Sequence, residues 1–195
     1  AANIREGMST EDINTLVYDF TVAHGAVPAP LNYEGFPKSV CTSINEEVCH
    51  GIPDKNIILK SGDIINVDVS TIYNGYFSDA SRMFMIGEVT EDRQKLVRVT
   101  KECLEKGIEA AQPWRFLCDV GAVIQEHAEN NGYSVVREFC GHGVGLKFHE
   151  IPEVEHVGRR GTGMLLVPGM IFTIEPMINM GKREIFIDED NDWTV

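Results

Sequence analysis

The chain carries one ten-residue pattern twice, first as Leu59-Lys60-Ser61-Gly62-Asp63-Ile64-Ile65-Asn66-Val67-Asp68 and again as Leu166-Val167-Pro168-Gly169-Met170-Ile171-Phe172-Thr173-Ile174-Glu175. In each copy a glycine leads into a short apolar run with strand character, and a carboxylate follows the glycine by six residues. Corresponding positions lie 107 residues apart, from Leu59 to Leu166 and from Asp68 to Glu175. Since internal repeats dictate architecture, the match predicts a duplicated unit whose halves each deliver an acid from a buried strand, the second over 170–177.

Two segments with a helical pattern are related by the same offset and are bracketed by Asp12 with Gly25 and by Asp119 with Gly132. Ser9 can cap the first of them, because Asp12 follows it by three residues. The offset divides the chain into halves of roughly 1–100 and 101–195, which we expect to form a single domain over 1–195.

Composition narrows the classes of protein to which the chain can belong. Its 195 residues suffice for one domain with a core of its own, or for two closely packed halves. There is no apolar run of membrane-spanning length and no signal peptide, so we expect a soluble, cytoplasmic protein without a membrane partner. The formal net charge of −13 disfavours nucleic acid, because phosphate binding requires a basic surface. Five cysteines without a C-x-x-C motif indicate reduced, mostly buried thiols.

The Asn74-Gly75 pair predicts a two-residue hairpin turn. Such a turn places Asp68 opposite Ser81 and Asp79 opposite Ser70. Because side chains alternate with period two, the two acids then share one face as diagonal neighbours, about 7–8 Å apart at the backbone. Two acids so close repel each other unless a cation lies between them, which makes a metal site the first hypothesis.

Taken alone, Asp79 is better explained as a solvated residue near the end of the hairpin. Asp68 is harder to explain in that way, because it interrupts an apolar strand, and Glu175 occupies the same place in the second copy. Two acids related by duplication indicate a shared site.

Histidine is a further candidate ligand, and the chain has six. His142 lies between two glycines, where the backbone can approach an ion closely. For His142, His50 and His149, a structural role and a functional role remain equally open, whereas His156 lies in a charged stretch and is expected to be exposed. The remaining two, His24 and His127, are expected to have surface or core roles. One histidine with several carboxylates favours Mn, Fe, Co or Zn, and a pair of such ions can support a hydrolase.

Six motifs in this order resemble those of the bacterial-type (type I) methionine aminopeptidases. They are His50-Gly51-Ile52-Pro53, Asn66-Val67-Asp68-Val69, Asp79 with Ser81, Cys140-Gly141-His142-Gly143-Val144-Gly145, Phe148-His149-Glu150 and Phe172-Thr173-Ile174-Glu175-Pro176. The resemblance implies the α+β pita-bread fold, with two pseudo-twofold-related halves of curved antiparallel sheet and flanking helices. It also implies a cytoplasmic, monomeric enzyme that removes the initiator methionine from nascent polypeptides in transient association with the ribosome.

The resemblance implies a cofactor of two divalent ions, Co, Mn, Fe or Zn. Asp68 would bind one ion, Asp79 would bridge both, and His142 and Glu175 would complete most of the other ion's shell. The catalytic set would be His50, His149 and Glu175, with His149 contacting the scissile amide and His50 beside the substrate. Positions lining the methionine pocket would be Tyr33, Phe36, Cys41, Phe148 and Trp193, together with His50 and His149. For Cys41 and Phe36, simple core packing remains an open alternative.

The chain departs from the family pattern at both ends. The family has a fifth ligand, a second bridging glutamate, on a strand beyond Trp193-Thr194-Val195, and an opening helix before the segment that Ser9 caps. We therefore expect a chain truncated at both ends, with weakened binding of the second ion and uncertain activity.

Two alternative functions stay open. An Xaa-Pro peptidase of the same fold would share the metal ligands and differ in the pocket. A noncatalytic interaction module of this fold would be expected to lose metal ligands, whereas this chain keeps the four named above.

Overall fold

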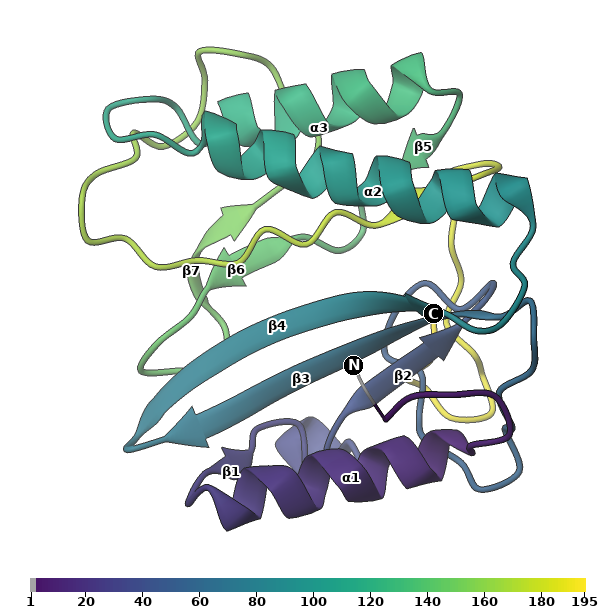
Figure 1. The fold of residues 1–195 in the computed structure, drawn as a ribbon. Helices are drawn as coiled ribbons and strands as arrows, with labels where there is room; N and C mark the ends of the chain where they lie inside the picture. Colours follow the sequence, from purple (N-terminus) through teal and green to yellow (C-terminus); the bar gives the residue numbers. More distant parts are fainter. Residues whose placement is uncertain (1–2) are drawn as a thin grey trace. The chain divides into compact units, whose positions relative to one another are not determined.

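The computed structural model describes residues 3–195 and divides the chain into two compact units. Unit 1 comprises Ala1–Arg93 with Phe186–Val195, and unit 2 comprises Gln94–Ile185. Figure 1 shows the helices and strands of both. No helix among the described residues is long and apolar enough to cross a bilayer.

Unit 1 is built on a four-stranded antiparallel sheet. Strand β3 is central and pairs with β4 along one edge. Along its other edge β3 pairs with both β2 and β1, with β2 at residues 65–68 and with β1 at residues 71–72 (Figure 1). Its elements are α1 (Thr10–Ala23), β1 (Val27–Pro28), the 3-10 helix η1 (Tyr33–Gly35), β2 (Cys41–Ile44), β3 (Ile64–Tyr73) and β4 (Tyr76–Met85).

The hairpin between β3 and β4 has the predicted register. Tyr73 pairs with Tyr76, and the turn residues Asn74 and Gly75 have φ angles of 50° and 84°. Positive φ at both central positions is what a two-residue turn needs to match the twist of the strands, which is why Asn-Gly specifies it. The turn thereby fixes every pairing along the two ten-residue strands.

Alternation along β3 gives the sheet one apolar and one polar face. Ile65 and Val67 are buried and pack with Ile13 of α1 in one hydrophobic cluster. The residues that alternate with these along the strand, among them Asp68 and Ser70, therefore project from the opposite face. The capping box of Ser9 and Asp12 at the start of α1 is present as predicted.

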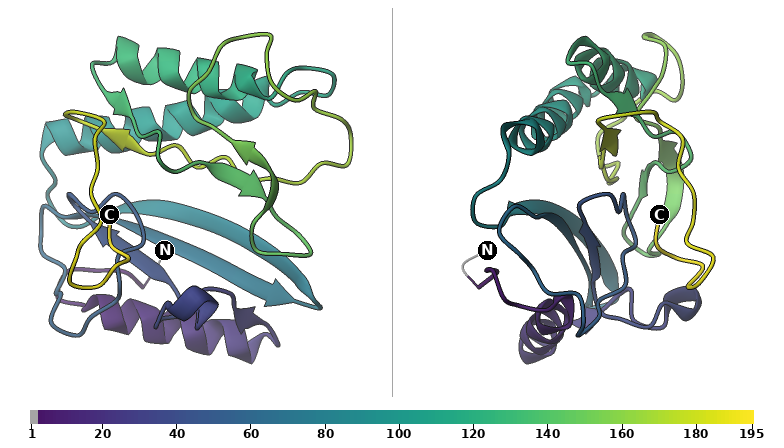
Figure 2. Two further views of the ribbon diagram at one scale, coloured as in Figure 1. Left: turned by 180° about the vertical axis from the view of Figure 1, so that it is seen from behind. Right: turned by 90° about the vertical axis from the view of Figure 1, so that its right-hand side faces the viewer.

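Unit 2 pairs two helices with short strands. Figures 1 and 2 show α2 and α3 side by side, and His127 Nε2 lies 2.8 Å from Glu102 Oε2 across them. Val99, Val120 and Ile124 belong to the core beneath these helices. The elements are α2 (Glu91–Ala110, which begins in unit 1), α3 (Cys118–Asn130), β5 (Ser134–Val135), β6 (Gly141–Gly143), β7 (Glu150–Val154) and β8 (Ile178–Asn179).

The predicted strand over 170–177 is wrong. In this segment only Phe172 forms a bridge, to Gly143 of β6, and regular pairing resumes at β8. Thr173 N–H still donates to the carbonyl of His142, but Glu175 N–H donates to the side chain of His156 instead of a backbone carbonyl. The ladder ends because a side chain takes the place of the neighbouring strand.

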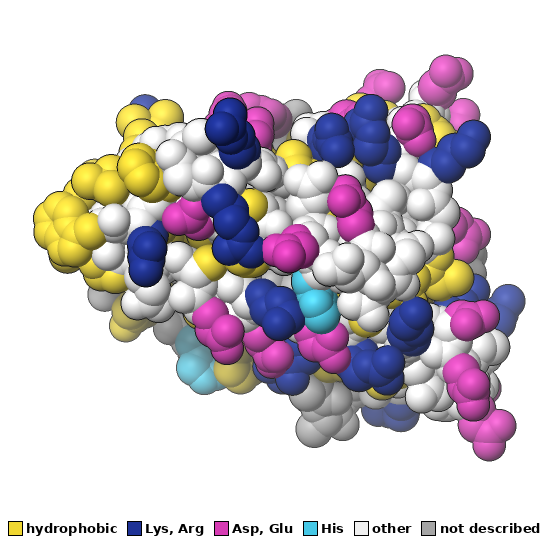
Figure 3. All heavy atoms as spheres, turned by 90° about the horizontal axis from the view of Figure 1, so that it is seen from above, with side chains coloured by type: hydrophobic (Ala, Val, Ile, Leu, Met, Phe, Trp, Pro, Cys, Tyr) yellow, Lys and Arg dark blue, Asp and Glu magenta, His cyan; other side chains and the backbone are white. Residues whose placement is uncertain are grey.

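Charges on the helical face of unit 2 are interspersed. Figure 3 shows Lys and Arg among Asp and Glu on this face, with hydrophobic side chains gathered at one end. Along α2, Arg98 pairs with Glu102 and Lys101 with Glu105, each four residues on.

All five cysteines are free, but only Cys103 is buried, so the prediction of mostly buried thiols is wrong.

Candidate functional site

Unit 1 carries its two candidate carboxylates on one face of the β3–β4 hairpin. Asp68 lies opposite Ser81 of β4 on one side and opposite Cys41 of β2 on the other. Asp79 lies opposite Ser70, whose hydroxyl donates to Asp79 Oδ1 at 3.0 Å. The acids are diagonal neighbours, as the turn predicts, within reach of a common ion.

The thiol of Cys41 lies among these negative charges. Burial raises the pKa of Cys41 strongly, and Asp68, Cys49 and Asp79 raise it further by their charges. The group therefore stays a protonated thiol, which behaves as a small apolar surface rather than as a nucleophile.

His50 belongs to an aromatic group in unit 1. Its ring centroid lies 6.3 Å from that of Trp193, which in turn lies 5.2 Å from Phe36 in an edge-to-face arrangement. Burial lowers the pKa of His50, and the charge of Asp79 partly opposes that effect. The backbone of His50 has φ of 55°, which is uncommon for a residue with a side chain and is often found at functional sites.

Tyr33 begins η1, three residues before Phe36 along the chain. Burial raises the pKa of Tyr33, and the charge of Glu34 contributes in the same direction. Of the residues expected to line a methionine pocket, Phe36 and Trp193 are in ring contact, and Tyr33 lies three residues before Phe36 along the chain.

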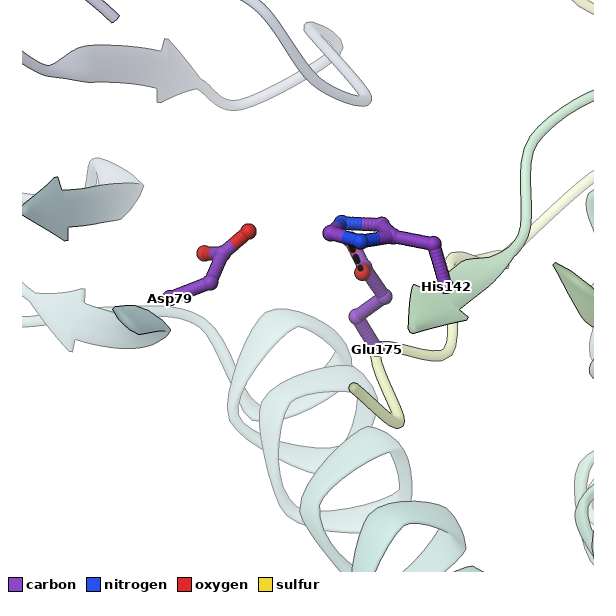
Figure 4. A group of neighbouring side chains, drawn as sticks. All are labelled: Asp79, His142 and Glu175. Carbon is purple, nitrogen blue, oxygen red and sulfur yellow. Dashed lines mark ion pairs between the residues drawn. The ribbon is translucent and has the colours of Figure 1, made fainter. Parts of the chain in front are cut away.

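In unit 2 the structure brings His142 and Glu175 together. Figure 4 shows the two side chains directed at one another, with His142 Nε2 3.5 Å from Glu175 Oε1. The His142 side chain is 12% exposed and that of Glu175 is 35% exposed, so the pair is partly shielded but reachable from solvent.

The tautomer of His142 suits a metal ligand. Its Nδ1 lies 2.9 Å from the carbonyl oxygen of Gly143, and a carbonyl can only accept, so Nδ1 carries the proton. In a neutral ring Nε2 then presents a lone pair toward the carboxylate oxygen, the arrangement of two ligands of one cation, whereas a protonated ring would pair with the carboxylate directly. Ligand atoms about 2.0–2.2 Å from one ion lie roughly 3–3.5 Å apart, which matches this pair. A histidine ligand whose other nitrogen donates to a backbone carbonyl is the usual arrangement at metal sites.

Thr173 joins the two residues. Its hydroxyl oxygen accepts the backbone N–H of His142 at 2.8 Å, and its hydrogen is donated to Glu175 Oε1 at 2.5 Å. Close packing maintains this arrangement, because a Cβ on Gly141 would lie 2.4 Å from the carbonyl oxygen of Thr173. The glycine beside His142 therefore allows the two backbones to approach closely.

Two further predicted residues lie against His142. Its ring centroid is 4.3 Å from that of His149, and the His149 ring stacks on Phe148 at 4.5 Å. Phe148 is buried and His149 is exposed, so the phenyl ring supports an imidazole that solvent can reach.

The prediction that His156 is exposed is wrong, because the side chain is only 1% exposed. Burial lowers the pKa of His156 to about 4. The signal that indicates burial is alternation: Pro152, Val154 and His156 are all buried, whereas Glu153 and Glu155 between them are exposed. Sequence reasoning did not identify His156 or Thr173 as site residues. For Thr173 the available signal is its position two residues before Glu175, because this spacing puts two extended residues on one face.

Comparison with known proteins decides the family. The model of metallopeptidase family M24 matches residues 1–191. The chain belongs to metallopeptidase family M24. Methionine aminopeptidase A of Synechocystis sp. is 52% identical over 194 residues, which cover 100% of this chain and 76% of that protein. A methionine aminopeptidase of Escherichia coli is 48% identical over 193 residues, covering 98% and 73%.

Solved structures confirm the fold of this M24 member. A crystal structure of methionine aminopeptidase from Rickettsia prowazekii has a TM-score of 0.97 at 46% identity and covers 99% of this chain and 77% of its own. The prolidase from Pyrococcus furiosus has a TM-score of 0.73 at 24% identity, covering 90% and 49%, and shows the fold alone. The predicted α+β pita-bread fold is thereby confirmed.

Proposed function

We propose that this chain is a metal-dependent aminopeptidase that removes the N-terminal methionine of nascent polypeptides. Membership of the metallopeptidase family and 52% identity to a methionine aminopeptidase support it. The observation that carries the proposal is the His142–Glu175 pair, because its histidine tautomer and 3.5 Å separation fit two ligands of one divalent ion.

The metal ligands we propose are Asp68 and Asp79 from unit 1 and His142 and Glu175 from unit 2. Asp79, His142 and Glu175 each offer a ligand atom and are each partly buried. We propose further that residues 1–195 act as one catalytic domain that takes two divalent ions, to both of which Asp79 would be a ligand. Bound divalent ions supply an activated water and polarise the scissile carbonyl.

The protein's own groups position the substrate. Phe36 and Trp193, with the protonated thiol of Cys41, would hold a methionine side chain, and Tyr33 and Phe148 would complete this apolar wall. His149, which stacks on Phe148 and is exposed, would donate to the scissile amide and to the oxyanion that follows. His50, kept neutral by burial, would assist proton transfer from the substrate side.

A test separates this function from its alternatives. The chain is stripped of metal, titrated calorimetrically with Mn²⁺ or Co²⁺ under anaerobic conditions, and assayed with Met-Gly-Met and with a Met-Pro dipeptide. We expect ion binding and cleavage of Met-Gly-Met in preference to Met-Pro. Preference for Met-Pro would favour the Xaa-Pro peptidase, and a folded chain that binds no ion would favour a noncatalytic interaction module.

Cytoplasmic location, transient association with the ribosome and a monomeric state remain predictions from the resemblance. We propose Co, Mn, Fe or Zn as the ions, because all four suit carboxylates with one histidine.

A further inference from the structure

His156 forms an unusual hydrogen bond with the chain around Glu175. Its Nε2 accepts the backbone N–H of Glu175 at 3.1 Å, although His156 lies nineteen residues earlier and is almost fully buried. In a regular strand that N–H would donate to a carbonyl of the neighbouring strand. Here the imidazole of His156 takes the place of that carbonyl at Glu175, the residue that we propose as a metal ligand.

The other ring nitrogen of His156, Nδ1, indicates that this hydrogen bond has a role besides stability. Because Nε2 accepts, the neutral ring carries its proton on Nδ1. Among residues 3–195 no hydrogen-bond partner of Nδ1 is found, although the atom is buried. Leaving a buried donor unsatisfied costs free energy, so packing alone does not account for a histidine at position 156.

The segment that carries His156 is anchored independently of the candidate ligands. A Cβ on Gly121 of α3 would lie 2.5 Å from the carbonyl oxygens of both Glu155 and Val157, so the helix and this segment are in direct backbone contact. Gly158 N–H also donates to Gln125 Oε1 of α3 at 3.3 Å. The position of His156 is therefore set by the helix core of unit 2.

Glu175 is thus held at two points. His156 fixes its backbone N–H, and Thr173 donates to its carboxylate oxygen Oε1. With both ends fixed, the carboxylate has little freedom to turn away from His142 Nε2. Groups that orient a ligand in this way raise metal affinity by removing the entropy cost of ordering it.

We propose that His156 is a positioning residue, which holds the backbone of Glu175 so that its carboxylate is preset for a divalent ion. The proposal rests on the proposed function, because it takes Glu175 as a metal ligand. It assigns His156 no contact with ion or substrate.

The experiment compares His156→Leu, His156→Gln and His156→Asn with the wild-type chain. Leucine fills the site without an acceptor, glutamine can place its oxygen near the position of Nε2, and the oxygen of asparagine is one methylene short. We expect His156→Leu and His156→Asn to lose roughly 10–100-fold in Co²⁺ affinity by calorimetry and to alter the visible spectrum of bound Co²⁺. His156→Gln should restore most of the affinity and the wild-type spectrum.

A readout without metal tests the hydrogen bond itself. In the ¹⁵N-labelled, metal-free chain, a scalar coupling should connect the Glu175 amide nitrogen with His156 Nε2, and the ring shifts should report a protonated Nδ1. A protonated Nε2 would overturn the inference, as would Co²⁺ affinity and spectra that are the same in His156→Leu and wild type. If His156→Leu does not fold, equal affinity in the glutamine and asparagine variants overturns it.

Failure of the proposed function gives a different result. A folded wild-type chain that binds no Co²⁺ would refute the metal site, and with it this role of His156. Co²⁺ binding that is indifferent to substitution at position 156 would refute this role and leave the metal site intact.

Discussion

Replacing Gly141 with alanine tests whether the close approach beside His142 holds the candidate ligand pair in place. A Cβ at this position would lie 2.4 Å from the carbonyl oxygen of Thr173, whereas real Cβ contacts essentially never fall under 3.0 Å. The two backbones must therefore separate by about 0.6 Å, the difference between those values. The obstacle is backbone, so no side-chain rotation can relieve it.

The cost of this separation can be estimated from the groups that it disturbs. The shift lengthens the hydrogen bond from Thr173 N–H to the His142 carbonyl and the one from His142 N–H to the Thr173 hydroxyl, both 2.8 Å. Overpacking of this kind costs about 1–3 kcal/mol. In a chain of 150–250 residues about 1 kcal/mol lowers Tm by roughly 2–4 °C, so Gly141→Ala should melt roughly 2–12 °C lower. Because the same shift moves His142 relative to Glu175, affinity for Co²⁺ should fall about 10–100-fold.

Gly145→Ala is the matched control, four residues later in the same turn. The nearest atom to its added Cβ would be Glu150 Oε1 at 3.9 Å, an ordinary contact with a flexible side chain. Scanning calorimetry of the metal-free chains gives Tm, and isothermal titration gives Co²⁺ affinity. If Gly141→Ala and Gly145→Ala agree in both measurements, the close approach does not constrain the site. A lower Tm with unchanged affinity would show that the approach serves stability only.

Three further predictions test other parts of the molecule. Asp79→Asn keeps an oxygen that can accept from Ser70 but loses the charge, so metal content measured by elemental analysis should fall; unchanged stoichiometry would contradict a bridging role. His149→Ala should retain metal content and lower kcat/KM roughly 10²–10⁴-fold, and unaltered turnover would exclude contact with the reacting amide. Hydrogen bonds from Ser9 lower the pKa of Asp12 below its usual 3.8, so its ionised form stabilises the folded state above that pH and the effect is lost as pH falls through the lowered value. The stability difference between wild type and Asp12→Asn, followed by urea unfolding, should shrink below pH 4; a constant difference would refute the capping role.

The parts of the fold that follow local rules could be predicted from the sequence. The register of β3 and β4 follows from two residues, Asn74 and Gly75, because a two-residue turn leaves one pairing available. That register alone places Asp68 and Asp79 on one face. The start of helix α1 could also be predicted, because the capping box of Ser9 and Asp12 is a local signal.

The environment of Glu175 could not be predicted from local pattern. Its apolar run has the composition of a strand, but whether a strand forms depends on a neighbour that can continue the ladder. In the fold the neighbour is β6 (Gly141–Gly143), whose Gly143 pairs antiparallel with Phe172, so Glu175 lies beyond the Gly141 end of that strand. There the N–H of Glu175 donates to the ring of His156. The alternation of Pro152, Val154 and His156 predicts that the ring is buried, but not which backbone group it meets.

The two copies of the repeated pattern therefore expose their acids by different means. In the first copy the ladder is complete, and Asp68 reaches the polar face because strand alternation puts it there, with Ser81 and Cys41 on either side. In the second copy the ladder is interrupted, and Glu175 depends on His156 for its backbone and on Thr173 for its carboxylate. A carboxylate fixed by a strand tolerates changes in distant side chains, whereas one fixed by two side chains does not. Substitutions behind Glu175 should therefore affect metal binding more than equivalent substitutions behind Asp68, although both acids occupy the same position of the repeated pattern.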